Sequence, residues 1–513
     1  MNLSVLDRSE EHNLDAPRRT PLWLLLVFVL MGFSIAVLVS LLAGSRPYGV
    51  LVAAGGILLA IPLGALLTQA LPQGLSKLRI LAQNWTWWHP LWFLIFFSML
   101  VFRIRDESAA RENPLDWYAM TRVLPEVFVS LALIVRLLLK KPNWMRALFT
   151  GIPGAMAVYC LVCVASSAWS VNVSWTAYKS LEFLADVSLL AAIVASADSS
   201  LTYQNLLDWT LTFYGLSLVG VWINLPLWPN EAMDGGRLTG VIPVEASNSV
   251  GTSGAVLALV SLCRLMPLFG RAKNRAWYFF LLIFGVVSMV MSGTRNSEGA
   301  FLFGVGLIVL FEKRLRKIAL IFTAAMVPVL TIATLLSDKL WLRTYDMVAS
   351  FAQRDQSAGA FDSLSGRTAW WAYGMEQLAH HPLTGMGAYA AGRFAVLGKL
   401  GVGSAAMMHS DWIEVAIGTS LWGIIPFAGA LIAAWYFLIR CIRGPAFAPD
   451  QRQLALECFA LLGMLTLHSF FNDELSWHCP LLYFAILGYA EFVRIQSKTE
   501  TAYAPTQSRP WQS

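Results

Sequence analysis

Long apolar runs recur along almost the whole chain. Each contains about 18 to 22 residues, the length that an α-helix needs to cross the hydrocarbon core of a bilayer. The runs are continuous, whereas the strands of a membrane barrel alternate apolar and polar residues. Composition agrees with this pattern, because 57% of the 513 residues are hydrophobic and only 13% are charged. The sequence therefore predicts an all-α, polytopic integral membrane protein.

About 12 to 14 transmembrane helices are expected. The predicted spans are Pro21–Gly44, Val50–Leu71, Trp85–Phe102, Val123–Leu139, Leu148–Ala165, Tyr178–Ala195, Trp209–Leu227, Ser249–Phe269, Trp277–Gly293, Gly299–Phe311, Ile318–Ser337, Trp412–Leu438, Ala455–Phe471 and Cys479–Ile495. The predicted organisation is a cytoplasmic tail (1–20), a transmembrane region with short loops (21–337), one long periplasmic loop (338–411), C-terminal transmembrane helices (412–495) and a cytoplasmic tail (496–513).

Lysine and arginine are distributed unevenly between the loops. If the spans alternate, one side receives Arg18, Arg19, Lys77, Arg79, Lys140, Lys141, Arg146, Arg271, Lys273, Arg275, Lys313, Arg314, Arg316, Lys317, Arg440 and Arg443. The positive-inside rule makes that side cytoplasmic and the long loop external. The segment Arg103–Arg122, with four arginines, is an exception on the external side. Because topology explains the net charge of +6, no nucleic-acid partner is needed.

Three arginines on the external side lie within two residues of a glycine. These are Arg237, Arg295 and Arg367. A neighbouring glycine lets the backbone approach a ligand closely, and a guanidinium offers a planar fork of donors that fits phosphate oxygens. Each arginine could instead extend toward the membrane surface and pair with a lipid headgroup. Both interpretations, a phosphate ligand and a headgroup partner, remain open for the three arginines at this point.

Lys179 is a fourth candidate for the diphosphate. It lies near the start of a predicted span, with Glu182 and Asp186 on the same helix face. Acidic residues at membrane depth indicate a functional site or an ion-pair partner. Lys179 is therefore either a substrate ligand or the structural partner of these acids.

His409 ends the long loop, just before the span that begins at Trp412. An imidazole titrates near neutrality and can serve as a general base. Asp411, two residues later, could orient that imidazole. A histidine at a helix end is also commonly a structural hydrogen-bond donor. We predict a catalytic role for His409, assisted by Asp411.

Several common catalytic motifs do not occur. The sequence contains no phosphate-binding G-x-x-x-x-G-K-[ST] loop, no H-E-x-x-H zinc pair and no G-x-S-x-G nucleophile turn. It also contains no paired aspartates of the kind that hold a metal and a nucleotide sugar. We expect no metal and no cofactor. A lipid diphosphate donor carries its own leaving group, so that arginines and one base would suffice.

These motifs resemble those of the O-antigen ligase and O-antigen polymerase superfamily, bacterial membrane enzymes that transfer glycans from undecaprenyl diphosphate. The similar segments are Trp169-Ser170 with Lys179, Arg237-Leu238-Thr239-Gly240 with Asn248, Ser292-Gly293-Thr294-Arg295, Ser365-Gly366-Arg367-Thr368-Ala369-Trp370, His381-Pro382-Leu383-Thr384-Gly385-Met386-Gly387, and His409-Ser410 leading to Gly423. Two positions depart from the family pattern. Lys179 replaces the usual arginine, and Ser420 replaces the first glycine of a Gly-x-x-Gly pair.

The resemblance, which covers roughly residues 166–423, implies roles for individual residues. It implies that Arg237 and Arg295 hold the diphosphate and that His409 activates the acceptor without a metal. The donor would be an undecaprenyl-diphosphate-linked glycan, and the acceptor a glycan or lipid A-core. The reaction would take place at the periplasmic face of the bacterial inner membrane, and a membrane partner could regulate chain length.

Two classes of function remain open at this point. One is a glycosyltransferase, either a ligase or a polymerase, which the sequence does not separate. The other is a transporter or flippase for a polysaccharide or lipid-linked glycan, without chemistry. Such a transporter would show repeated halves and ionisable residues near the bilayer midplane. No internal repeat is visible, and the cations of interest lie at the external rim. We therefore predict the transferase.

Overall fold

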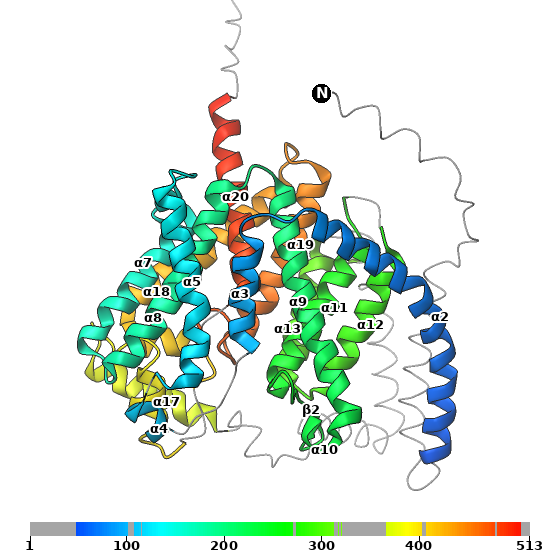
Figure 1. The fold of residues 1–513 in the computed structure, drawn as a ribbon, viewed down its shortest axis with the longest axis horizontal. Helices are drawn as coiled ribbons and strands as arrows, with labels where there is room; N and C mark the ends of the chain where they lie inside the picture. Colours follow the sequence, from blue (N-terminus) through cyan, green and yellow to red (C-terminus); the bar gives the residue numbers. More distant parts are fainter. Residues whose placement is uncertain are drawn as a thin grey trace, which may run out of the picture. The chain divides into compact units, whose positions relative to one another are not determined.

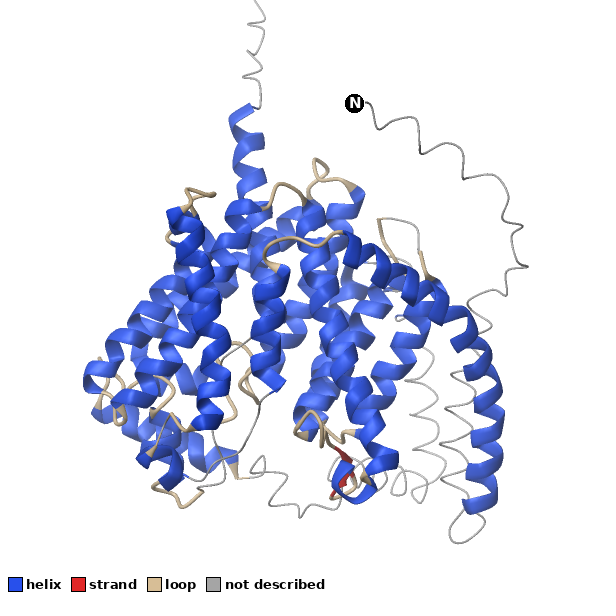
Figure 2. Cartoon of the chain, viewed as in Figure 1, coloured by secondary structure: helices blue, strands red, loops and turns tan. Residues whose placement is uncertain are grey.

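The computed structural model describes residues 48–100, 107–113, 115–269, 273–311, 316–317, 320, 366–402, 407–477 and 480–503. These residues are almost entirely helical (Figures 1 and 2), which confirms the all-α prediction. The only sheet in this part of the chain is a hairpin of β1 (Met233–Asp234) and β2 (Arg237–Leu238). The predicted spans Pro21–Gly44 and, apart from Leu320, Ile318–Ser337 lie outside the described residues.

The chain divides into two compact units, Met1–Leu71 and Pro72–Ser513. In the first unit, the described residues form the beginning of α2 (Tyr48–Gln83). The second unit contains all of the predicted site residues.

Four helices of the second unit are long and apolar enough to cross a membrane. They are α7 (Gly151–Ala165) with its continuation η1 (Ser166–Trp169), α9 (Ser200–Leu227), α11 (Ser247–Leu265) and α18 (Asp411–Arg443). The helices α3 (His89–Leu100) and α12 (Arg275–Met291) are shorter but also apolar. The chain is therefore a multi-pass membrane protein.

Close helix packing depends on small residues. Helices α11 and α12 pack along their length, and Gly254 of α11 faces Gly285 of α12. A Cβ built on Gly254 would lie 2.6 Å from the Gly285 carbonyl oxygen, and one built on Gly285 would lie 2.5 Å from the Gly254 oxygen. In lipid, where apolar side chains gain little by leaving the solvent, such close backbone approach is a main source of helix association.

The remaining helices complete the bundle around α18. Helix α18 packs against α7, α19 (Pro449–His468) and α20 (Leu481–Tyr503), while α8 (Val173–Ser196) packs on α7. Helix α13 (Arg295–Phe311) packs on α19 and α11, and α5 (Trp117–Leu138) packs on α3 and α8. The short helices are α4 (Glu107–Glu112), α6 (Trp144–Leu148) and α10 (Pro229–Ala232).

The second half of the predicted long loop is itself folded. It contains α17 (Arg367–His380) and a π-helix, η2 (Ala391–Leu397). Both pack with Met408 and with Ile417 of α18 in a small apolar core of their own. The apolar residues Trp370, Trp371 and Leu378 recur at helical spacing, which accounts for α17. Residues 338–365 of this loop are outside the described part.

Helix α18 is interrupted at Ser420, where φ is 55° and ψ is −151°. The interruption frees the carbonyls of Ile417 and Gly418, which accept hydrogen bonds from Met386 (2.9 Å) and Gly387 (3.0 Å). Ser420 Oγ donates to the Pro382 carbonyl. Gly385, with φ of 64°, has no room for a side chain, because a Cβ would lie 2.6 Å from the Gly418 backbone. The His381–Gly387 turn is therefore docked on α18, although a serine replaces the family's glycine.

Candidate active site

Three of the predicted arginines come together at one end of the helical bundle. Arg237 lies on β2, Arg295 begins α13 and Arg367 begins α17. Burial lowers the pKa of Arg367, Asp473 opposes this, and the nearby charges of Arg237 and Arg295 lower the pKa further. Arg237 also bonds to Ser292 and Thr294, in the turn directly before Arg295. The structure thus groups side chains that are 58 and 72 residues apart in the sequence.

Arg237 is fixed by the turn that leads into Arg295. Its Nε donates to the Ser292 carbonyl at 3.0 Å, and its Nη2 donates to Thr294 Oγ1 at 3.3 Å and to Asn248 Oδ1 at 3.4 Å. The turn itself needs Gly293, whose φ of 65° lets the chain reverse from α12 into α13. These bonds join the Arg237 loop to the turn that leads into Arg295.

Arg367 connects the long loop to the opposite side of the site. Its Nη1 donates to the Phe471 carbonyl at 2.7 Å, in the connection between α19 and α20. Gly366, with φ of 86°, precedes it and turns the chain into α17. The guanidinium is therefore held at the start of a helix, where backbone N–H groups also favour an anion.

His409 lies beside this connection in an uncommon backbone conformation. Its φ is 53°, in the left-handed region that costs a residue with a side chain about 1 to 2 kcal/mol. The His409 N–H donates to Asp473 Oδ2 at 2.9 Å, which stabilises that conformation. The ring lies 6.3 Å from the ring of Trp370. Asp473 thus positions the backbone from which the imidazole projects.

The imidazole is oriented by Asn472. His409 Nδ1 lies 3.3 Å from Asn472 Oδ1, while Asn472 Nδ2 donates to Glu474 Oε1 at 2.8 Å. A carboxylate oxygen accepts hydrogen bonds, so it faces the amide nitrogen of Asn472 and leaves the amide oxygen to His409. An amide oxygen can only accept, so the proton must lie on Nδ1. The Nε2 lone pair is then available as a base.

The environment keeps this imidazole neutral. Burial lowers the pKa of His409 to about 4, with a further contribution from the positive charge of Arg367, and the Asn472 hydrogen bond opposes both. At neutral pH the ring is therefore uncharged and can accept a proton.

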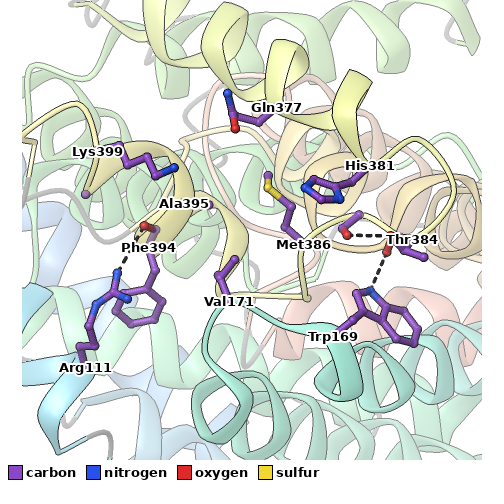
Figure 3. A pocket seen from close by; sticks show the side chains of 12 residues that line it. Arg111, Trp169, Val171, Gln377, His381, Thr384, Met386, Phe394, Ala395 and Lys399 are labelled. Atoms are coloured by element: carbon purple, nitrogen blue, oxygen red, sulfur yellow. Dashed lines mark hydrogen bonds between the residues drawn. The ribbon is translucent and has the colours of Figure 1, made fainter.

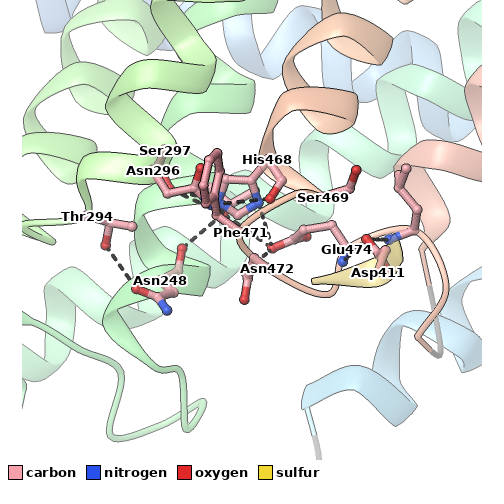
Figure 4. A network of polar contacts seen from close by, with 12 residues as sticks. Asn248, Thr294, Asn296, Ser297, Asp411, His468, Ser469, Phe471, Asn472 and Glu474 are labelled. Carbon is pink, nitrogen blue, oxygen red and sulfur yellow. Dashed lines mark hydrogen bonds and ion pairs between the residues drawn. The ribbon is translucent and has the colours of Figure 1, made fainter. Parts of the chain in front are cut away.

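Asp411 faces a different partner from the one expected. Its carboxylate accepts hydrogen bonds from the backbone N–H groups of Glu474 (2.9 Å), Leu475 (2.9 Å) and Ser476 (2.7 Å), and from Ser476 Oγ at 2.6 Å. Figure 4 shows Asp411 beside Glu474, in the network that continues to Asn472 and His468. Asp411 thus holds the segment that carries Asn472 and Asp473, both of which contact His409.

Lys179 pairs with a carboxylate of its own helix. It is buried in α8 and its Nζ is 2.5 Å from Glu182 Oε2. Glu126 of α5 is also close enough to interact with it electrostatically. None of the three arginines is among the charges that act on it. These contacts agree with a structural role, in which Lys179 is the ion-pair partner of the acidic residues.

Sequence reasoning did not identify Asn472, Asp473, Glu474 or His468. His468 is buried, with Nε2 3.3 Å from Thr252 Oγ1 and Nδ1 3.4 Å from Glu474 Oε1. A signal was present, because Asn472-Asp473-Glu474 is a polar triplet at the external end of two predicted spans. Its function could not be inferred without knowing that this connection meets His409.

A comparison with protein families gives a match over residues 278–428, to the O-antigen ligase family. The matched region contains Arg295, Arg367 and His409, together with the interruption at Ser420. This part of the chain is similar to O-antigen ligase domains. This match confirms the superfamily that the motifs indicated, and it supports a membrane enzyme of the glycan-transferase class in polysaccharide biosynthesis. A comparison with curated proteins finds no match. Arg237 and the 472–474 triplet lie outside the matched region.

Proposed function

We propose that this protein transfers a glycan from undecaprenyl diphosphate to an acceptor hydroxyl at the periplasmic face of the bacterial inner membrane. The observation that carries the proposal is the grouping of Arg237, Arg295 and Arg367 beside an oriented, neutral His409. Cations that lie close together repel each other, and an anion bound between them would relieve this repulsion. A diphosphate supplies such an anion and is also a good leaving group.

In this mechanism the three arginines bind the diphosphate in the ground state and stabilise the charge that develops as it leaves. Charge-assisted bonds from guanidinium groups suit this role, and a preformed site needs no reorganisation during the reaction. The acceptor oxygen attacks the anomeric carbon, and the bond from that carbon to the diphosphate oxygen breaks. A single displacement of this kind inverts the anomeric configuration.

His409 receives the proton. As the acceptor oxygen forms its bond to carbon, its proton passes to Nε2, and imidazolium forms next to Asn472. A pKa of about 4 makes the free enzyme a weak base. A bound diphosphate would offset the charge of Arg367, the second cause of the low value, and so strengthen the base when substrate is present. Asn472, Glu474 and Asp411 serve as positioning residues.

The acceptor decides whether the enzyme is a ligase or a polymerase. A ligase would use lipid A-core and a polymerase would extend a lipid-linked glycan, with a membrane partner that sets chain length. Deletion of the gene separates the two outcomes. Loss of a ligase leaves long chains on the polyprenyl carrier and bare core lipid, whereas loss of a polymerase leaves single repeat units on the acceptor.

The direct test is transfer by the full chain in proteoliposomes, with a radiolabelled undecaprenyl-diphosphate oligosaccharide and an acceptor extract. We expect release of undecaprenyl diphosphate in equal amount to the new glycosidic bonds, also in the presence of a chelator. His409→Ala should bind donor without releasing the diphosphate. Movement of intact donor across the bilayer, with no diphosphate release, would instead establish a flippase.

A further inference from the structure

A cavity whose lining includes neither the three arginines nor His409 lies beside α17 and η2. It has a volume of about 520 Å³, within the range of small-ligand sites, about 300 to 1,000 Å³. Its walls come from α4, the end of η1, α17, the His381–Gly387 turn and η2 (Figure 3). Gln377, on this cavity, lies ten residues and so about 15 Å along α17 from Arg367.

The cavity is positively charged. Its twelve lining residues include Arg111 and Lys399, together with the titratable His381, and contain no aspartate or glutamate. Lys399 and His381 are exposed, so the charge is available to a ligand from solution. Arg111 is held by the wall itself, because its Nη2 donates to the Phe394 carbonyl at 3.4 Å and its guanidinium lies 5.0 Å from the Phe394 ring. An anion fits this surface.

The cavity also presents an aromatic face. Trp169 is 45% exposed, and its indole N–H donates to the Thr384 carbonyl at 3.0 Å (Figure 3). A tryptophan of a membrane-interface belt directs its N–H toward lipid headgroups. Here the N–H is bonded within the protein, which fixes the ring in advance. A fixed, exposed ring suits the apolar face of a sugar, because little conformational entropy is lost on binding.

We propose that this cavity binds a saccharide unit that carries a carboxylate or a phosphate. Arg111 and Lys399 pair with the anion, the ring of the sugar stacks on Trp169, and Gln377 offers an amide to its hydroxyls. This inference rests on the proposed function only for the source of the saccharide, a glycan bound several units away from the reacting bond. Recognition there would select acidic glycans and fix the direction in which the chain leaves the active site.

The test measures binding without transfer, so that its failure and the failure of the proposed function are distinguishable. The full chain carrying His409→Ala, in phosphatidylcholine nanodiscs, is titrated with trigalacturonic acid and with its neutral methyl ester. We expect the acid to bind about ten- to a hundredfold more tightly than the ester, as two charge-assisted contacts require. The difference should shrink with added salt. Equal affinity for the two ligands overturns the proposal.

Variants locate the binding. Arg111→Gln combined with Lys399→Gln should remove the preference for the acid. Trp169→Leu should lower the affinity for both ligands. Arg440→Gln combined with Lys141→Gln removes the same charge from exposed positions at the predicted cytoplasmic side and should change neither affinity. If the Arg111 double variant does not fold, Lys399→Glu at an exposed position carries the same test. Unchanged binding of the acid in a folded variant overturns the location.

A lipid headgroup could supply the same anion. Nanodiscs with one third phosphatidylglycerol distinguish this source. If binding of trigalacturonic acid is the same in both nanodiscs, the cavity is a saccharide site. If phosphatidylglycerol abolishes the binding of trigalacturonic acid but leaves the binding of the methyl ester unchanged, the cavity binds a lipid phosphate. The saccharide proposal then fails.

Discussion

Two cationic groups in this protein look similar in the sequence and differ in the structure. In the first, Arg237, Arg295 and Arg367 lie near one another beside His409, and backbone carbonyls or neutral side chains accept from two of them. In the second, Lys179 is buried against Glu182, with Glu126 and Asp186 in the same group. Neutral oxygens accept from the first group, with Asp473 as a nearby negative charge, whereas carboxylates surround the lysine of the second.

The difference shows how to distinguish a ligand-binding cation from a structural one in a membrane protein. A buried lysine needs a carboxylate at contact distance, because an unpaired charge away from water is very costly. Arginines held by carbonyls keep their full charge, and this charge is then available to a substrate. Substitutions in each group test whether the two differ in this way.

His409→Ala should reduce transfer by about a hundred- to ten-thousandfold, the usual contribution of a positioned base. His409→Gln should not restore it, because an amide cannot accept the proton. The measurement is initial rate in proteoliposomes, with donor binding checked separately. A parental rate in a folded His409→Ala protein would make His409 a structural residue and leave the arginine group without a base.

Lys179→Met should destabilise the protein by about 3 to 5 kcal/mol, because it leaves Glu182 buried without its partner. Replacing both residues, Lys179→Met with Glu182→Leu, should recover most of that loss. The midpoint of thermal unfolding in detergent, followed by tryptophan fluorescence, reports the effect. Transfer per folded molecule should stay near the parental rate in the double variant, and a large loss there would move Lys179 into the donor site.

Arg237→Ala and Arg295→Ala should each weaken transfer by about ten- to a hundredfold, the value of one charge-assisted interaction with the diphosphate. Lysine at either position should recover only part of the activity, because a point charge lacks the planar fork. The loss should appear in KM for the lipid diphosphate as well as in kcat. Arg440→Gln, exposed on α18, is the matched control. Full activity in both alanine variants would leave Arg367 as the remaining ligand.

The pH dependence should follow the protonation of His409. The base must be neutral, so kcat/KM should stay level as pH falls from 8 and decline only near the free-enzyme pKa of about 4. The decline in kcat should lie at higher pH, since bound diphosphate offsets Arg367. Asn472→Asp places a carboxylate at the imidazole and should move both declines upward by about one pH unit or more. An unchanged profile in that variant would show that Asn472 does not contact the catalytic imidazole.

The helical architecture could be predicted because it depends on local properties of the sequence. Apolar runs of membrane length predict helices, and every predicted span within the described residues overlaps one. The candidates Arg237, Arg295, Arg367 and His409 could be found for the same reason, since each lies in a short motif. The folded second half of the long loop was missed, because its apolar core joins α17, η2 and Ile417 of α18.

Only the tertiary structure decided which residues contact one another. Nothing in the sequence indicates that Asn472, 63 residues after His409, supplies the hydrogen bond that Asp411 was expected to make. Neither does it indicate that Arg237 contacts the turn before Arg295. Residue type and spacing determine which groups can hold charge near a membrane. Helix packing determines which of those charges meet, because contacts between distant segments depend on the shapes of whole helices.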